Sequence, residues 1–346
     1  MSDNIKPTDN GPIDAVILWV DGSDPKLAEK RARYLVEEQL TSAHPGAVPA
    51  RFASSNEIRY CVLSILTFAP FIRNIYIVTD EQDPGLDDEV LVRFPERAGC
   101  LKIIDHREIF RGYEEYLPTF NSSSIHTLMW RIKGLSENFI YFNDDMILIR
   151  DTVEEDWFIG GLPVLRGKWL LPPVRRIAGS SLKLLANRHI RGNKEYRPKI
   201  SFYVRQWQTS LVLGWRWRYF FHCHTAHPMR IKTLEEFFRS NEELLRKTIS
   251  YRFRDSEQLL ASSLAYHLEI RNGTAHMARL NLGYLHPWYS EERLNRRIDR
   301  CTQDQRIKSI CVQSVEMLSG NQREKIFNWL DNVLKSNNPL SLKNGN

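Results

Sequence analysis

The sequence of 346 residues contains only five cysteines, and they form no close pairs with the spacing of a metal site. Their odd number fits reduced core thiols better than a disulfide framework. No apolar run reaches the roughly 18 residues needed to span a bilayer. The polar segment Met1–Pro12 also lacks the basic and apolar parts of a signal peptide. These absences predict a cytoplasmic protein with a large reduced core.

Acidic residues are scarce between Trp157 and Leu234. This segment holds fifteen Lys and Arg residues against the single acid Glu195, whereas the net charge of the whole chain is only +6. Such a field attracts polyanions, and the candidates are a nucleotide diphosphate, an anionic polymer, nucleic acid or an acidic membrane surface. We see no helix here with the large apolar face of an interfacial helix. The segment therefore allows peripheral contact with the cytoplasmic face of a membrane, through charge alone.

An apolar stretch from Phe139 to Ile149 is interrupted by Asn143, Asp144 and Asp145. The apolar residues predict a strand buried on both faces. Two adjacent carboxylates at the end of a buried strand repel each other unless a cation lies between them or one of them is protonated. Asp144 and Asp145 are therefore candidate metal ligands. The alternative is a surface turn, since Asn and Asp also favour turns.

Three other predicted strands end in the same way. Ile13–Val20 leads into a loop with Asp21 and Asp24, Asn74–Val78 into Asp80, and Leu101–Ile104 into Asp105. Ligands of open α/β sheets bind beyond the carboxyl ends of the strands, which would bring these acids to one crevice. Glycine and proline in the first loop also fit an ordinary turn.

Amphipathic helices alternate with these strands, which predicts an α/β fold: a Rossmann-like, mostly parallel sheet flanked by helices, with a helical and basic C-terminal half. Ser54 and Glu57 predict a capping box at the start of one helix. We expect an N-terminal α/β half over residues 13–155. Residues 156–335 would complete one catalytic domain, and residues 1–12 and 336–346 would form flexible tails.

A run of small polar residues, Asn121 and Ser122 among them, leads into a predicted helix that carries His126, with Arg131 one turn beyond. Helix N-termini with such donors bind phosphate well, although the same residues also make a plain N-cap.

At this point several ordered blocks resemble the Stealth family, a group that includes bacterial capsular polysaccharide phosphotransferases and the catalytic subunit of the lysosomal-enzyme N-acetylglucosamine-1-phosphotransferase. The blocks, which fit in order and spacing over about residues 13 to 150, are Val16–Pro25, Asn56–Tyr60, Ala69–Pro70, Ile75–Gln82, Leu117–Ser122, Gly134–Glu137 and Phe142–Asp145. Two later segments, His224–Met229 and Arg252–Gln258, resemble the family more weakly.

The resemblance implies transfer of a hexose 1-phosphate from a nucleotide sugar, such as a UDP-sugar, to a glycan hydroxyl. The nucleoside monophosphate would be released, and the product would be a capsular or exopolysaccharide with phosphodiester linkages. A Mg²⁺ or Mn²⁺ ion would neutralise charge on the diphosphate while a base takes the acceptor proton. The implied partners are the donor and the growing polysaccharide, with possible peripheral association at the inner membrane or the capsule assembly machinery and no nucleic acid.

The resemblance also implies roles for individual residues. His227 is the candidate general base, with His224 as the alternative, and Arg254 is a phosphate-binding cation. Asp145 joins His227 and Arg254 as a candidate catalytic residue, and the candidate metal ligands are Asp21, Asp144 and Asp145. The candidate substrate-binding residues are Asp24, Arg59, Asp80, Asn121, Ser122, His126, Arg131 and His224.

Three positions depart from the family pattern. His126 stands where many members carry Glu, Leu63 stands where they carry Arg, and Cys311-Val312-Gln313-Ser314 lacks the acid of the corresponding element. Two other functions stay open on the residues alone. One is a metal-dependent nucleotide-sugar glycosyltransferase, which would release a nucleoside diphosphate. The other is a non-catalytic polyanion-binding module, whose binding would depend steeply on salt.

Overall fold

The computed structural model describes residues 10–37, 55–190 and 201–335. Its strands are β1 (Ile13–Leu18), β2 (Ile72–Thr79), β3 (Leu101–Asp105), β4 (Asn138–Asn143), β5 (Met146–Leu148), β6 (Phe158–Ile159), β7 (Leu162–Arg166), β8 (Lys168–Leu170), β9 (Tyr219–Phe221), β10 (His227–Arg230), β11 (His276–Ala278), β12 (Leu282–Leu285) and β13 (Ser309–Val312). Its α-helices are α1 (Pro25–Glu37), α2 (Glu57–Phe68), α3 (Asp87–Arg93), α4 (His106–Ile109), α5 (Ser122–Leu128), α6 (Val174–Leu185), α7 (Phe202–Val212), α8 (Ile231–Arg239), α9 (Glu242–Ile249), α10 (Ala261–Asn272), α11 (Glu291–Gln303) and α12 (Gly320–Lys335).

The central sheet has the strand order β10-β4-β1-β2-β3. Strands β1 to β4 are parallel, and β10 adds an antiparallel edge strand to β4. Leu18, near the end of β1, pairs with Val78 on one side and Asn143 on the other. The carboxyl ends of β1, β2 and β4 therefore meet at one edge of the sheet. The predicted α/β fold with a mostly parallel sheet is confirmed.

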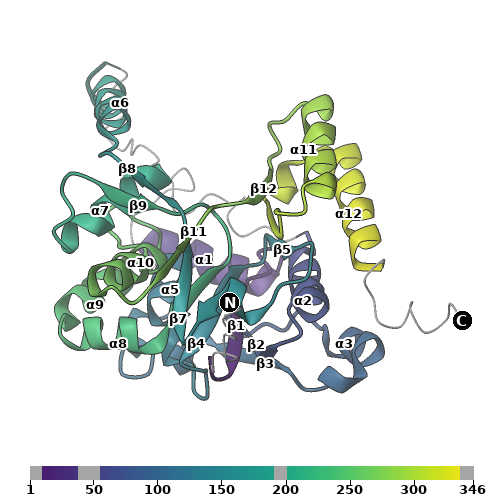
Figure 1. Cartoon of the computed structure of the whole chain (residues 1–346). Coiled ribbons are helices and arrows are strands. Elements are labelled where there is room, and N and C mark those ends of the chain that lie inside the picture. The colour runs from purple at the N-terminus through teal and green to yellow at the C-terminus, as the bar shows by residue number, and fades with distance from the viewer. Residues whose placement is uncertain (1–9, 38–54, 191–200, 336–346) are drawn as a thin grey trace, which may run out of the picture.

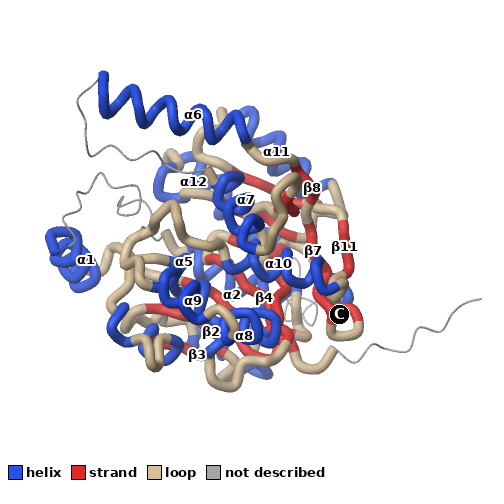
Figure 2. The backbone as a smooth tube through the Cα atoms, turned by 90° about the vertical axis from the view of Figure 1, so that its left-hand side faces the viewer, coloured by secondary structure: helices blue, strands red, loops and turns tan. Residues whose placement is uncertain are grey.

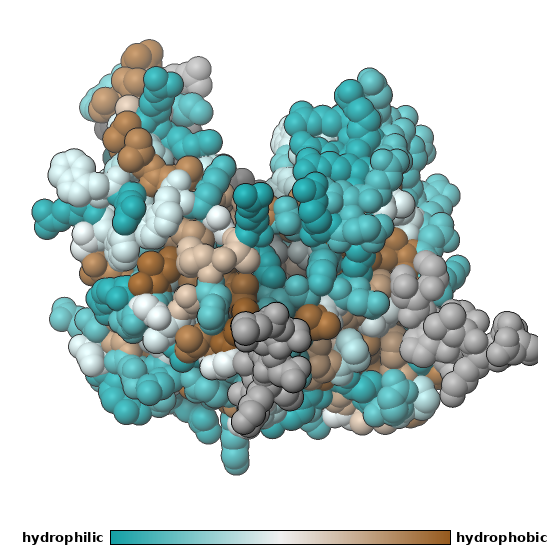
Figure 3. Space-filling model, in the orientation of Figure 1, coloured by the Kyte–Doolittle hydropathy of each residue, from teal (hydrophilic) through white to brown (hydrophobic). Residues whose placement is uncertain are grey.

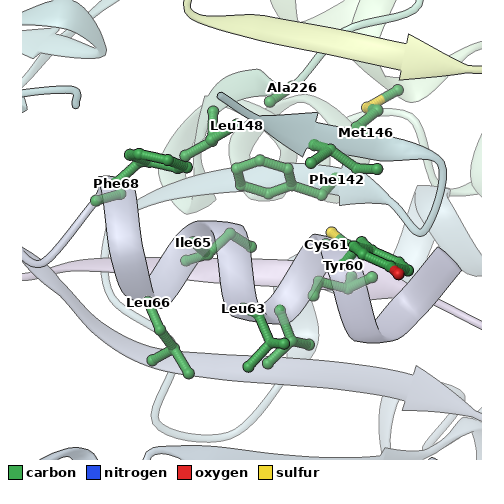
Figure 4. Close-up of a cluster of buried hydrophobic side chains, with 14 of the residues drawn as sticks. Tyr60, Cys61, Leu63, Ile65, Leu66, Phe68, Phe142, Met146, Leu148 and Ala226 are labelled. Carbon is green, nitrogen blue, oxygen red and sulfur yellow. The ribbon is translucent and has the colours of Figure 1, made fainter. Parts of the chain in front are cut away.

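Both faces of this sheet are covered. Along β4, Ile140 and Phe142 join the core beneath α2, whereas Phe139 and Tyr141 join the core beneath α5, α8 and α10. Successive strand residues point to opposite faces, so a sheet covered on both sides requires the continuous apolar runs seen in the sequence. Figure 4 shows Cys61 of α2 on the side that faces Phe142, and Figure 2 shows α5, α8 and α9 over the other face.

The second half of the chain returns twice to the first. β10 pairs with β4, and β13 pairs antiparallel with β5 and parallel with β12. Helices α11 and α12 stand beside each other over β12, at the upper right of Figure 1. Two smaller sheets, with the orders β11-β7-β6 and β8-β9, complete the pairing among the described residues. Residues 13–155 and 156–335 thus share their sheets.

The predicted capping box at the start of α2 falls partly outside the described residues, because Ser54 lies there. Asn56 precedes the helix with a positive φ of 73°, and its side chain makes no cap hydrogen bond. The carboxylate of Glu57 accepts from the backbone N–H of Ser55 at 2.5 Å and is buried. Of the two expected tails, residues 1–9 and 336–346 also lie outside the described part of the chain.

We expected no helix with a large apolar face in the basic segment, and this prediction is wrong. Val174–Leu185 forms the amphipathic helix α6, none of whose side chains is buried. Its apolar residues alternate with polar and basic ones, so the apolar face becomes apparent only when the residues are placed on a helix. No helix among the described residues is long and apolar enough to cross a bilayer.

Candidate active site

The turn from β4 to β5 carries the two adjacent aspartates. Asp144 and Asp145 are half-buried, and the backbone carbonyl of Asp145 accepts from Val312 N at 2.9 Å. This bond fixes the turn against β13. Burial raises the pKa of Asp144 well above its usual range, and the negative charges of Asp145 and Glu57 raise it further. The sheet edge therefore holds an acid that resists ionisation until a cation approaches.

Further carboxyl groups surround the turn. Burial raises the pKa of Glu57 on α2, and the charges of Glu316 and Asp145 add to the rise. Glu316 follows β13, and its own pKa is raised by burial and by Asp145, against the opposing effect of Arg323. Three segments far apart in the chain thus place carboxyl groups near one point.

The donor atoms at this point fit a divalent cation. One ligand atom from each of Asp145, His224 and Cys311 lies within 4.8 Å of the others. Asp145 Oδ1 is buried and has no hydrogen-bond partner, while its Oδ2 accepts from Cys311 Sγ at 3.4 Å. An unpartnered buried carboxylate oxygen is costly, and a bound cation would satisfy it. Carboxylate oxygens suit Mg²⁺ and Mn²⁺, whereas the imidazole and thiol of this group would favour softer metals.

Cys311 is the residue of this group that resists ionisation. Burial raises the pKa of its thiol well above the usual range, and Asp145 and Asp144 raise it further. Cys61, buried on α2 with Sγ 3.6 Å from Asn143 O, is affected in the same way. Both thiols are therefore neutral at physiological pH, and Cys311 acts as a weak donor to Asp145.

The third predicted metal ligand, Asp21, lies beyond the neighbouring strand β1. Its Oδ1 accepts from Ser23 N at 2.9 Å and Ser23 Oγ at 2.6 Å, and its backbone N–H donates to Gln82 Oε1. Gln82 also donates to Asp24 Oδ2 at 3.0 Å. These bonds hold the loop after β1 against the loop after β2.

A cluster of buried aromatic rings packs at the end of β4, on the face of the sheet opposite α2. Tyr141 stacks on His126 with ring centroids 3.9 Å apart and on His227 at 6.2 Å. The ring of His222 meets that of His227 edge-on at 4.3 Å. Burial lowers the pKa of His126 and His222 to about 3 each. It also lowers that of His227 well below the usual range, with His222 next in effect. These three imidazoles are therefore neutral.

The two candidate bases differ in access. His227 is 2% exposed, and its Nδ1 lies 3.1 Å from the hydroxyl of Tyr266. His224 is half-buried, and its Nδ1 lies 3.4 Å from Asn143 Nδ2. A general base needs to reach the proton that it takes, so this geometry favours His224, the alternative in the sequence-based prediction.

The phosphate-binding candidates on α5 fall into two groups. Asn121 is buried: it caps α5 through Ser123 N, and its amide donates to Tyr251 O and Gln258 Oε1. Ser122 accepts a hydrogen bond from Arg254, whose charge lowers the pKa of Tyr141 against the larger raising effect of burial. Ser122 and Arg254 thus lie on the side of the ring cluster, whereas Asn121 joins α5 to the segment before α10.

Two predicted cations make structural contacts. Arg59 pairs with Glu89 of α3 through two hydrogen bonds of 2.7 and 2.6 Å. Arg131 donates to the carbonyl oxygens of Ile109 and Arg111, each at 2.6 Å, and so holds the chain after α4. Their guanidinium donors are largely engaged there.

The remaining predicted residue, Asp80, follows β2. Its carboxylate pairs with Lys30 of α1 at 2.9 Å, so it neutralises a lysine of the first helix. Asp105, after β3, accepts from Arg107 N and caps the short helix α4. The four strand ends therefore share an edge of the sheet. The turn after β4 carries the carboxyl cluster, whereas the acids at the ends of the other three strands mainly hold loops in place.

Comparison with known proteins assigns two of these segments to one family. The model of Stealth protein conserved region 1 matches residues 11–35, and that of conserved region 2 matches residues 51–162. The chain carries the first two conserved regions of the Stealth family. Between them, these regions supply β1, α2, β2 and the β4–β5 turn of this chain.

Curated relatives agree with this assignment. A capsular polysaccharide phosphotransferase of Actinobacillus pleuropneumoniae is 35% identical over 215 residues, which are 59% of this chain and 56% of the relative. An exopolysaccharide phosphotransferase of Streptomyces coelicolor is 45% identical over 147 residues, 42% of this chain and 25% of the relative. This chain thus spans about half the length of the capsular relative and a quarter of the other.

Among solved structures, mouse xyloside xylosyltransferase 1 gives a TM-score of 0.39 at 11% identity, covering 88% of this chain and 98% of that one. A score of this size supports no argument about the site.

Sequence reasoning missed three members of the site. Glu57 was assigned to a helix cap, and Cys311 was counted among the core thiols. Glu316 was not among the candidate site residues. The available signal was the element around Cys311, which departs from the family pattern by lacking its acid. In the structure, β13 brings this element beside Asp145.

Proposed function

We propose that this Stealth chain is a sugar-phosphate transferase. It moves a hexose 1-phosphate from a nucleotide sugar, with a UDP-sugar as the first candidate, to a hydroxyl of a capsular or exopolysaccharide chain. The observation that carries the proposal is the match of conserved region 2 across the β4–β5 turn, where Asp145 lies close to His224. Relatives named as capsular and exopolysaccharide phosphotransferases support it.

In the proposed reaction, the acceptor oxygen attacks the phosphorus that bears the sugar. The bond from this phosphorus to the bridging oxygen of the diphosphate breaks, and the nucleoside monophosphate leaves with that oxygen. His224 takes the proton of the acceptor hydroxyl, and Asn143 lies beside it with its side-chain nitrogen 3.4 Å from the His224 ring. The buried, neutral side chains of His227 and Tyr141 stack on each other in the ring cluster and take no proton.

Asp144 and Asp145 would hold a Mg²⁺ or Mn²⁺ ion, with Asp21 across the strand edge as a further candidate ligand. When bound, the ion supplies charge neutralisation at the diphosphate. Arg254, steadied by Ser122, adds a fixed cation for a phosphate oxygen. His126 stands where the family pattern has Glu, and it contributes a neutral ring to the cluster with Tyr141 instead of an acid.

The proposed partners are the nucleotide-sugar donor and the growing glycan. The proposal places the protein in the cytoplasm, with peripheral association at the inner membrane or the capsule assembly machinery.

The deciding experiment incubates the purified chain with a panel of nucleotide sugars, Mg²⁺ and a capsule oligosaccharide primer, and identifies the nucleotide released. We expect nucleoside monophosphate, lost on adding EDTA and lowered at least about 10²-fold by Asp145→Asn. Asp105→Asn is the matched control, because this aspartate ends β3 and caps α4 away from the carboxyl cluster.

Two other outcomes would overturn the proposal. Release of a nucleoside diphosphate would identify an ordinary glycosyltransferase. Salt-dependent binding of the polymer, without turnover and unaffected by Asp145→Asn, would identify a polyanion-binding module.

A further inference from the structure

Helix α6 stands away from the body of the protein. Figure 1 shows it projecting above the strands β8 and β9, and Figure 2 shows it at the upper edge of the molecule. None of its twelve residues is buried, and it continues into a π-helical turn over Ala186–Ile190. Arg176 ties it to α7 by placing its guanidinium 4.2 Å from the ring centroid of Tyr203. A helix of this length is marginally stable by itself in water, so a surface that covers one face would stabilise it.

One face of α6 is apolar and exposed. Val174, Ala178, Leu182 and Leu185 recur at intervals of four, four and three residues, which places them on one side of a helix. Val174 is 64% exposed, Leu182 66% and Leu185 54%. Figure 3 shows this hydrophobic surface along α6. No described residue buries this stripe, and that is unusual for four apolar side chains in a row.

Two further exposed apolar side chains flank the end of the β8–β9 ladder from which the chain leads to α6. In the antiparallel β8–β9 ladder, Leu170 pairs with Tyr219, so Leu171 and Trp217 leave the ladder at the same end. Leu171 is 78% exposed and Trp217 84%. A tryptophan ring with one polar N–H suits the boundary between water and an apolar medium. We call Leu171, the four stripe residues and Trp217 the α6 face.

The described stretches of the chain that carry the α6 face hold basic residues and no acidic ones. Between Phe158 and Ile190 the chain has six Lys and Arg residues and no Asp or Glu. Arg175 and Lys183 of α6 are exposed. The segment 201–234, which contributes Trp217, also lacks acidic residues. The surface therefore combines a row of apolar side chains with cations and no compensating acid.

We propose that the α6 face docks on an anionic lipid bilayer, with α6 lying in the plane of the headgroups. A second copy of this chain would bring like charges together, which opposes self-association. A soluble anionic glycan would satisfy the cations but would leave Leu182 and Leu185 in water. An anionic bilayer satisfies both groups, because apolar burial and attraction to headgroups add. The inference gives the peripheral association within the proposed function a defined surface and lipid class.

The test measures co-sedimentation of the full chain with phosphatidylcholine vesicles prepared with and without phosphatidylglycerol. We expect binding to the vesicles that contain phosphatidylglycerol, weakened by salt, and at least about a tenfold loss in Leu182→Glu/Leu185→Glu. Leu91→Glu/Val92→Glu is the matched control: it adds the same charge at exposed apolar side chains of α3, which are 53% and 75% exposed. Circular dichroism checks that both variants fold.

Three results would overturn the inference. Equal loss of binding in the α3 control would mean that added charge alone explains the effect. Binding that salt abolishes but the α6 variant does not change would identify an electrostatic surface for polyanions. A change of oligomeric state in the α6 variant without lipid binding would identify a self-association face. The nucleotide-release assay uses soluble donor and primer without lipid, so either proposal can fail while the other stands.

Discussion

Replacing His224 or His227 by alanine separates catalysis from stability. His224 is half-buried beside Asn143, so His224→Ala should cost under about 1 kcal/mol of unfolding free energy. As the proposed base, however, it should lower kcat about 10²- to 10⁴-fold. The matched control is His276→Ala, because His276 is an exposed histidine on β11 and should change neither quantity.

His227→Ala should behave in the opposite way. The variant removes a ring packed between Tyr141 and His222 and leaves the hydroxyl of buried Tyr266 without this partner. The lost packing and the unsatisfied hydroxyl together cost about 3 to 5 kcal/mol.

Urea unfolding and nucleotide release at equal folded concentration give the two quantities. Near-normal turnover in His224→Ala, or a stable but inactive His227→Ala, would refute the reasoning and return the base to His227.

Three further predictions concern single groups. Burial lowers the pKa of His126 and His222 to about 3, so the unfolded chain takes up protons first and stability falls as pH drops below about 6.5. Each should cost about 2 kcal/mol at pH 5, and His126→Phe should flatten the pH profile of urea unfolding; an unchanged slope would contradict this. Arg230→Met should destabilise by about 3 kcal/mol, because the buried carboxylate of Glu269 loses two hydrogen bonds of 2.9 and 2.6 Å. Adding Glu269→Met should restore much of that loss in thermal unfolding. A double variant whose loss of stability equals the sum of the two single losses would contradict an interaction between Arg230 and Glu269. Cys311→Ser should keep Mg²⁺-supported transfer but weaken inhibition by Cd²⁺, since it removes the soft ligand; equal inhibition curves would place the thiol outside the metal site.

The parallel strands and their acidic ends could be predicted because both signals are local. Continuous apolar runs such as that before Asp144 report burial on both faces, and the acids follow directly in the chain. The placement of His224 and His227 could not be predicted, because it depends on β10 returning to pair with β4 more than eighty residues later. No pattern near these histidines encodes that pairing.

Three other features were missed for physical reasons. Glu57 has the sequence context of a helix cap, and only the packing of α2 against the β4–β5 turn turns it toward other carboxyl groups. A single cysteine such as Cys311 carries no spacing signal, so its position beside Asp145 emerges only from the β13–β5 pairing. The α6 face is local, yet interspersed cations concealed its periodicity.

That β13–β5 pairing has a consequence for synthesis on the ribosome. Residues Met146–Leu148 emerge early, but their partner strand Ser309–Val312 emerges more than 150 residues later. Until then the turn that bears Asp145 lacks its hydrogen bond from Val312 and its neighbour Cys311. A nascent chain can thus bury most of the central sheet while its reaction centre is still open, and that centre is completed only after β13 has been translated.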